Sequence, residues 1–157
     1  MSINNIPPLS DPEIDLGFAY AFESPRRRYA KILHRAGADF NQVFNFMLHD
    51  SYMQPHLHPS DEKSEDIYLV KGQLSLYFFD DFGNVEETFL LEAGKRMHVC
   101  VPPFTWHTYV MRSEKVITFE TMSGRYDPNT WKKAAPWAPD EQSNGCLEYL
   151  SSLRVHS

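Results

Sequence analysis

The sequence predicts an all-β domain, an antiparallel sandwich or barrel, with a short helix before the strands and an irregular tail after them. Short runs rich in β-branched and aromatic residues follow one another from residue 39 to residue 122. Turn-forming residues separate these runs, such as Gly72, the segment 80–84 and the Ala93-Gly94 pair. Many short strands at this spacing are typical of a closed antiparallel fold. The expected strands lie at 40–48, 67–70, 73–79, 85–91, 97–101, 106–111 and 116–121.

The segments on either side of the strands are expected to pack on the same domain. Ser10-Asp11-Pro12-Glu13 has the pattern of a capping box, and the apolar residues after it predict a helix that ends before Pro25. The tail is rich in Pro and Trp, so we expect it to wrap the barrel as irregular structure, with a last short helix at 146–153. The chain therefore reads as one domain in three parts: an arm and helix (1–38), a barrel (39–122) and a C-terminal wrap (123–157).

Composition excludes several classes of protein. The chain has 157 residues, 42% hydrophobic and 14% aromatic, which suits a globular domain with its own core. The formal charge of −6 argues against a nucleic-acid partner. No apolar run is long enough to span a membrane, residues 1–8 do not resemble a signal peptide, and Cys100 and Cys146 are expected to be free thiols. We therefore expect a cytoplasmic protein with no membrane partner.

One constellation of residues predicts a metal centre. His56 and His58 are two positions apart, so on a strand their side chains share a face. Glu65 follows in the next strand region, and His107 comes from a later strand after a turn at Pro102. Three imidazoles and a carboxylate suit one divalent transition metal ion, such as Zn, Fe, Mn, Ni or Cu. Asp61 and Glu62 in the same loop are alternative carboxylates.

At these residues the sequence resembles the cupin superfamily. The first cupin motif is similar to His56-x-His58-x6-Glu65-x6-Gly72, and the second is similar to Pro102-x-Phe104-x-x-His107. The first motif departs in the longer gap between His58 and Glu65, and the second in having Phe104 where cupins have glycine. The spacing from Glu65 to Gly72 fits the motif, which favours Glu65 as the carboxylate ligand. The resemblance implies a cupin-type antiparallel β-barrel, or jelly roll.

Further segments resemble one group within the superfamily, the WbuC-type cupin fold metalloproteins. They span most of the chain in order, and the resemblance implies a small bacterial metalloprotein connected with surface-polysaccharide (O-antigen) gene clusters. It does not imply a particular reaction. The similar segments are Ser24-Pro25-Arg26-Arg27-Arg28 and then His34, Pro55-His56-Leu57-His58-Pro59, Lys63-Ser64-Glu65, Phe79-Asp80-Asp81-Phe82-Gly83, Trp106-His107-Thr108, Tyr126-Asp127-Pro128 and Ala135-Pro136-Trp137-Ala138-Pro139.

A run of three arginines, 26–28, stands out in this acidic chain. The plainer interpretation is a solvated edge or a set of salt bridges to nearby acids. The more specific interpretation is an anion-binding site at the mouth of the barrel, with Arg26 and Arg28 binding the carboxylate or phosphate of a substrate.

Four other residues are candidates for the pocket. Gln54 shares strand parity with His56, and Tyr109 shares it with His107, so both could bind a ligand there. His34 is a candidate general acid or base if the segment after Arg28 pairs with the barrel. Tyr126 is a candidate phenol at the same pocket. For His34 and Tyr126, packing or a surface position is the competing interpretation.

The sequence leaves three functions open. The first is a metal-dependent isomerase or epimerase that acts on a small polar molecule, such as a sugar or nucleotide-sugar derivative. The second is an oxygen-using enzyme of the non-haem-iron dioxygenase type. The third is a cupin that binds or senses a small molecule without converting it. The family resemblance and the aromatic content also favour a homodimer.

Overall fold

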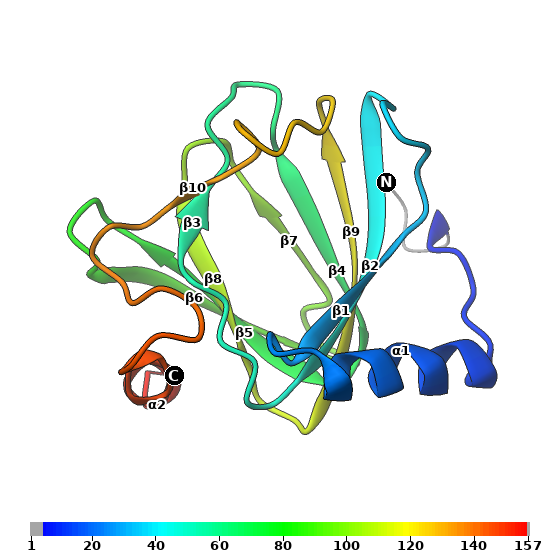
Figure 1. The fold of residues 1–157 in the computed structure, drawn as a ribbon, viewed down its shortest axis with the longest axis horizontal. Coiled ribbons are helices and arrows are strands. Elements are labelled where there is room, and N and C mark those ends of the chain that lie inside the picture. Colours follow the sequence, from blue (N-terminus) through cyan, green and yellow to red (C-terminus); the bar gives the residue numbers. More distant parts are fainter. Residues whose placement is uncertain (1–4, 157) are drawn as a thin grey trace.

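The computed structural model describes residues 5–156, so the first four residues of the expected arm lie outside the described residues. Two five-stranded sheets face each other, and every strand pair within them is antiparallel (Figure 1). The first sheet has the order β1 (Arg28–Ile32), β2 (Phe40–Leu48), β9 (Lys115–Ser123), β4 (Glu65–Lys71) and β7 (His98–Val101). The second has the order β10 (Lys133–Ala134), β3 (His56–Leu57), β8 (Trp106–Met111), β5 (Gln73–Phe79) and β6 (Val85–Glu92). This is the jelly-roll fold that the sequence predicts.

The two helices lie on the outside at one end of the barrel (Figure 1). Helix α1 (Asp11–Glu23) begins at the predicted capping box: the Ser10 hydroxyl accepts from the Glu13 amide, and the Glu13 carboxylate accepts from the Ser10 amide. Phe18 anchors the helix against Phe46 of β2, with ring centroids 5.4 Å apart in an edge-to-face pair. Helix α2 (Cys146–Arg154) covers the second sheet through Cys146, Leu150 and Leu153. Both helices confirm the sequence-based prediction.

The core between the sheets consists of alternate residues of the central strands. Ile67 and Leu69 of β4 pack against Leu74, Leu76 and Met111 of the facing sheet, and all of them are fully buried. Gly72 makes the tight turn from β4 to β5 with φ of +86°. A Cβ atom there would lie 2.3 Å from the carbonyl oxygen of Lys115, so the glycine of the first motif is required by packing as well as by the backbone.

Besides β3, which the sequence analysis expects at His56 without giving it bounds, two strands were not among those the sequence predicts. β1 lies within the segment expected to be an arm and helix, and it pairs with β2 from Arg28↔Met47 to Ile32↔Val43. β10 has two residues and joins the tail to the sheet edge beside β3. Both are short and carry mixed polar residues, so neither shows the apolar alternation that predicts a strand. β1 carries the arginine run into the first sheet, β10 joins the tail to the second sheet (Figure 1), and Glu141 of the tail pairs with Arg26 and Arg28.

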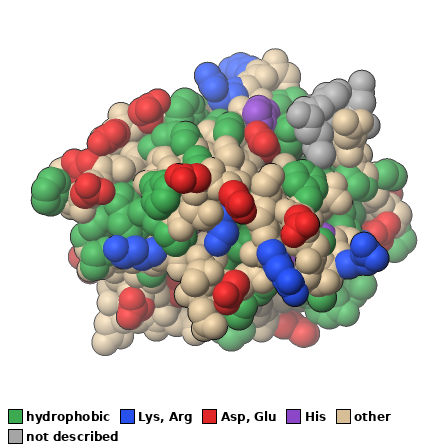
Figure 2. All heavy atoms as spheres, turned by 90° about the horizontal axis from the view of Figure 1, so that it is seen from above, with side chains coloured by type: hydrophobic (Ala, Val, Ile, Leu, Met, Phe, Trp, Pro, Cys, Tyr) green, Lys and Arg blue, Asp and Glu red, His purple; other side chains and the backbone are tan. Residues whose placement is uncertain are grey.

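Charges of both signs are spread over the surface. Figure 2 shows acidic side chains distributed across one face, with fewer basic side chains between them, in keeping with the formal charge of −6. None of the helices in residues 5–156 is long and apolar enough to cross a bilayer.

Candidate metal centre

Three histidines from the second sheet converge between the two sheets. His56 on β3 and His107 on β8 are directly paired in the ladder, and His58, two residues after His56 and just beyond the end of β3, joins them. One ligand nitrogen from each of the three lies within 4.8 Å of the other two, and all three side chains are buried. The structure therefore brings together the three histidines that the sequence singles out.

Backbone carbonyls fix the orientation of each imidazole. The Nδ1 atom of His56 lies 2.9 Å from the carbonyl oxygen of Gln54. The Nδ1 atom of His58 lies 2.9 Å from the carbonyl oxygen of Trp131, and that of His107 lies 2.8 Å from the carbonyl oxygen of Thr105. A carbonyl oxygen can only accept, so Nδ1 must be the protonated nitrogen and Nε2 carries a lone pair. The second nitrogen of a metal-bound histidine commonly donates in this way. The backbone thus prepares three Nε2 atoms as ligands.

Glu65, at the start of β4 in the opposite sheet, is the carboxylate that faces the cluster. Its Oε1 lies 3.3 Å from Nε2 of His107, and its Oε2 lies 3.9 Å from Nε2 of His58. Glu65 is buried, whereas Asp61 and Glu62, the alternative carboxylates, are exposed. The geometry therefore places Glu65, and neither of its competitors, against the histidines.

Three buried ligand atoms at this centre make no hydrogen bond within residues 5–156. They are Nε2 of His58, Nε2 of His107 and Oε1 of Glu65. Leaving such an atom unsatisfied costs about 1–3 kcal/mol, so clusters of this kind need a partner that the chain does not supply. Two donor atoms bound to one ion at roughly 2.0–2.2 Å stand about 3–3.5 Å apart, which is the separation between Glu65 and His107. The residues present therefore fit a metal ion.

Burial sets the protonation of the cluster. Desolvation lowers the pKa of His107 to about 4 and the pKa of His56 well below its ordinary value. Desolvation also lowers the pKa of His58, against the opposing effect of the Glu65 carboxylate. All three histidines are consequently neutral at neutral pH, which is the form that binds metal ions. Burial raises the pKa of Glu65, as expected for an acid with no full charge partner beside it.

A second buried acid, Glu120 on β9, lies beside the centre, and sequence reasoning missed it. Its Oε1 accepts from the Tyr109 hydroxyl at 2.8 Å, and its Oε2 accepts from Thr118 at 2.6 Å and Asn45 at 2.5 Å. Burial, followed by the charge of nearby Glu65, raises the pKa of Glu120 to about 7. The signal in the sequence was a single charged residue within the apolar run 116–122.

A cavity of about 540 Å³ opens onto the centre. Five of the six residues that the sequence proposes for catalysis or substrate binding line it: Arg26, Arg28, His34, Tyr109 and Tyr126. His34 reaches it because the segment after Arg28 does pair with the barrel as β1, and its Nδ1 lies 3.0 Å from the amide nitrogen of Gln42. Trp131 and Lys132 of the tail complete the wall, and sequence reasoning proposed neither.

Gln54 is placed differently from the other candidates. It does not line the cavity, and its amide nitrogen lies 3.2 Å from the carbonyl oxygen of Ala135, 3.4 Å from that of Ala138 and 3.3 Å from Asp140 Oδ1. Strand parity with His56 did not identify its partners, because Gln54 precedes β3 and the tail passes beside it. In this structure the side chain fastens the tail to the barrel.

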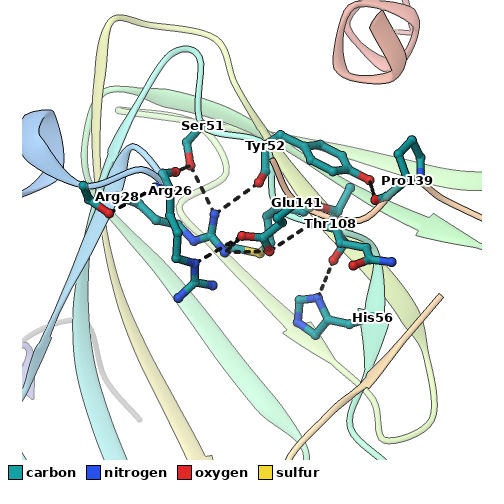
Figure 3. A network of polar contacts seen from close by, with 11 residues as sticks. Arg26, Arg28, Ser51, Tyr52, His56, Thr108, Pro139 and Glu141 are labelled. Carbon is teal, nitrogen blue, oxygen red and sulfur yellow. Dashed lines mark hydrogen bonds and ion pairs between the residues drawn. The ribbon is translucent and has the colours of Figure 1, made fainter. Parts of the chain in front are cut away.

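The arginine run separates into three different environments. Arg28 is buried, and its Nη2 lies 2.9 Å from each carboxylate oxygen of Glu141, while Arg26 reaches Glu141 through Nε at 3.1 Å. Figure 3 shows both guanidinium groups converging on this carboxylate. Arg27 points away and pairs with Asp50 on the surface. The expectation of salt bridges is met at all three positions.

The two sheets and their buried histidine cluster define the class: a cupin-type jelly roll whose site could hold a metal ion. The chain belongs to the family described as a domain of unknown function, DUF6016, whose profile matches residues 10–91. No curated protein matches the sequence.

Solved structures share the fold at low sequence identity. Protein SO0799 from Shewanella oneidensis is 12% identical with a TM-score of 0.61, over 76% of this chain and 82% of the other. KdgF from Halomonas sp. is 21% identical with a TM-score of 0.52, over 67% of this chain and 84% of the other. An oxalate oxidase in complex with the substrate analogue glycolate is 12% identical with a TM-score of 0.57, over 85% of this chain and 75% of the other. At these identities the likeness concerns the fold.

Proposed function

We propose that the protein binds one divalent transition metal ion through His56, His58, Glu65 and His107 and acts on a small hydroxylated molecule held in the adjoining cavity. The observation that carries the proposal is the set of converging Nε2 lone pairs, each fixed by an Nδ1 bond to the backbone, facing a buried carboxylate with an unsatisfied oxygen. Such an arrangement leaves coordination positions on the cavity side for a substrate.

The cavity supports a sugar or nucleotide-sugar derivative as the molecule. Its walls include Asn41, whose amide nitrogen donates to backbone carbonyls while its buried Oδ1 has no hydrogen-bond partner within residues 5–156 and can accept from a hydroxyl group. Tyr126 and Trp131 form an edge-to-face pair with ring centroids 5.0 Å apart on another wall, and aromatic faces suit the apolar face of a sugar ring. The resemblance to WbuC-type proteins supports a role with surface-polysaccharide sugars and a homodimeric bacterial protein. Sedimentation that gives only the monomer mass would remove the dimer from this proposal.

The favoured reaction is an isomerisation or epimerisation. A bound metal ion would supply Lewis-acid polarisation of a carbonyl or hydroxyl oxygen. The chain's own residues would orient the sugar and move a proton, with His34 and Tyr126 the candidate acid and base because both line the cavity.

A second candidate, an oxygen-using iron enzyme, has one observation in its favour. Glu65 lies against His58 and His107, which gives two histidines and one carboxylate, with His56 as a further imidazole of the same cluster. Such sets hold non-haem iron in oxygenases. Iron as the metal in purified protein, with oxygen uptake in the presence of a candidate sugar, would favour this function over the isomerase.

Elemental analysis of the purified protein tests the metal centre directly. We expect about one equivalent of a transition metal in the wild-type protein and its loss in His58→Ala. His98→Ala is the matched control, because His98 is an exposed histidine that pairs with Asp66 on the outside of the barrel. Equal metal content in the two variants, with both folded by circular dichroism, would show that the ion binds elsewhere.

The same measurement separates the candidate carboxylates. Glu65→Gln should lower the metal content, and Glu62→Gln should leave it unchanged, because only Glu65 is buried against the histidines. The opposite order would assign the ligand to the loop before β4.

A further inference from the structure

Three cationic side chains line the cavity that leads to the metal centre. Arg26 and Arg28 stand at the start of β1, and Lys132 comes from the tail just before β10. Glu141 is the carboxylate that pairs with this group, and it pairs with both arginines. Against Glu141 these three positive charges leave a positive surplus at this wall, while the other acids of the lining, Glu65 and Glu120, lie at the histidine cluster.

The three cations differ in how far they are already engaged. Arg28 is fully used: besides Glu141, its Nη1 lies 3.4 Å from the Ser51 hydroxyl and 3.2 Å from the carbonyl oxygen of Tyr52 (Figure 3). Arg26 gives only Nε to Glu141, and its two terminal nitrogens have no hydrogen bond to residues 5–156. Its side chain is 50% exposed. Arg26 therefore has a free fork of donors.

Lys132 is the second unengaged donor. Within the described chain its ammonium group makes no hydrogen bond or ion pair, although it lines the cavity. Desolvation lowers the pKa of Lys132, and the charges of Arg26 and Arg28 add to that effect while those of Glu141 and Glu65 oppose it. Crowded like charges with open donors favour the entry of an anion, which would accept hydrogen bonds from both groups.

We propose that Arg26 and Lys132 form an anion subsite of the cavity that binds a carboxylate or phosphate group on the same small molecule whose hydroxyl end reaches the metal centre. The inference rests on the proposed function for the identity of the site and adds the charge of the substrate. Glu141 has the role of a built-in counter-ion that holds Arg28 and orients Arg26 while leaving their neighbour Lys132 free. A cavity of about 540 Å³ accommodates an acidic or phosphorylated sugar.

Calorimetric titration with three matched sugars tests the subsite. The probes are D-galacturonate, D-galactose 1-phosphate and neutral D-galactose, titrated into the metal-loaded protein at constant ionic strength because salt screens exposed charges. We expect at least one charged probe to bind about tenfold more tightly than galactose, since a charge-assisted hydrogen bond at a half-exposed site is worth about a factor of ten. Preference for galacturonate or for galactose 1-phosphate identifies the anion as carboxylate or phosphate.

Two variants and one control locate the effect. Lys132→Gln and Arg26→Gln should each weaken the charged probe about tenfold and leave galactose binding unchanged. Lys133→Gln is the matched control, since Lys133 is the adjacent residue of the same charge, but it does not line the cavity and its Nζ lies 6.0 Å from the ring centroid of Trp106. Lys133→Gln should bind all three probes like the wild-type protein.

Four outcomes would overturn the subsite. The first is equal affinity for charged and neutral probes, and the second is an equal loss of affinity for the charged probe in Lys133→Gln and Lys132→Gln. The third is an unchanged affinity in both Lys132→Gln and Arg26→Gln. The fourth is no binding of any probe at about 10 mM. Metal analysis of the same samples keeps the two proposals apart. If the protein takes up no metal but still prefers the charged probe, and this preference depends on Lys132, the subsite is supported and the metal centre is rejected. Bound metal without a charge preference would do the reverse.

Discussion

The ion pair between Arg28 and Glu141 should be a principal stabilising contact between the tail and the barrel, and Glu141→Gln tests this. The Arg28 side chain is only 6% exposed and the Glu141 side chain 19%, so the substitution leaves a buried guanidinium facing a neutral amide. Breaking a buried pair by removing one partner costs about 3–5 kcal/mol. Because Glu141 keeps some contact with water, we expect the low end, about 3 kcal/mol. For a chain of this length that corresponds to a fall in Tm of about 6–12 °C.

The assay is thermal and urea unfolding of the metal-free protein at pH 7, followed by circular dichroism. Asp50→Asn is the control, because it breaks an ion pair of the same run, Arg27–Asp50, whose side chains are 32% and 57% exposed. An exposed pair is worth at most about 1 kcal/mol. A double variant, Arg28→Met with Glu141→Met, should recover much of the loss, since it removes the stranded charge. If Glu141→Gln lowers the unfolding free energy no more than Asp50→Asn does, the reasoning from burial is wrong.

Two further predictions concern the pH dependence of the histidine cluster and the motif glycine. Desolvation lowers the pKa of His107 from 6.5 to about 4, so between these values the unfolded chain binds more protons than the folded one and stability falls as the pH falls. In metal-free protein, the stability of the wild type relative to His107→Gln should therefore drop by about 2.5 kcal/mol from pH 7.5 to pH 4.5, measured by urea unfolding, and a constant difference would contradict the assignment. Gly72→Ala should cost about 2–4 kcal/mol, because a Cβ would meet the Lys115 carbonyl at 2.3 Å in addition to the positive φ. Gly94→Ala has a similar φ of +79° and no atom within 4 Å, so it should cost about 1–2 kcal/mol, and equal losses would show that the close approach at Gly72 is not a constraint.

The barrel strands and the histidine cluster could be predicted because they depend on local patterns. Alternation along a strand decides which side chains share a face, and it placed His56 and His58 together and set the bounds of β2, β5 and β8. The motif spacing from Glu65 to Gly72 favoured the carboxylate that the structure places against the histidines, since that glycine makes the turn that ends β4.

Alternation failed where the partner of a side chain came from a distant segment. Gln54 was expected in the pocket, but carbonyl groups of the tail meet its amide first. Glu120 was overlooked because one acid in an apolar strand shows no pattern, and its three hydrogen-bond donors come from three positions, Asn45, Tyr109 and Thr118. The tail itself has no periodicity from which its path could be predicted.

The sequence by itself determined a closed antiparallel β fold, the capped first helix and the histidines that converge on one point. These follow from periodicity, turn residues and spacing, which act over a few residues. Only the tertiary structure decided that Glu141 holds Arg28, that Lys132 joins Arg26 at the cavity and that Glu120 stands beside Glu65. The physical reason is that charge pairing and burial depend on which segments meet in space, and residues 28 and 141 pair across a separation of 113 residues.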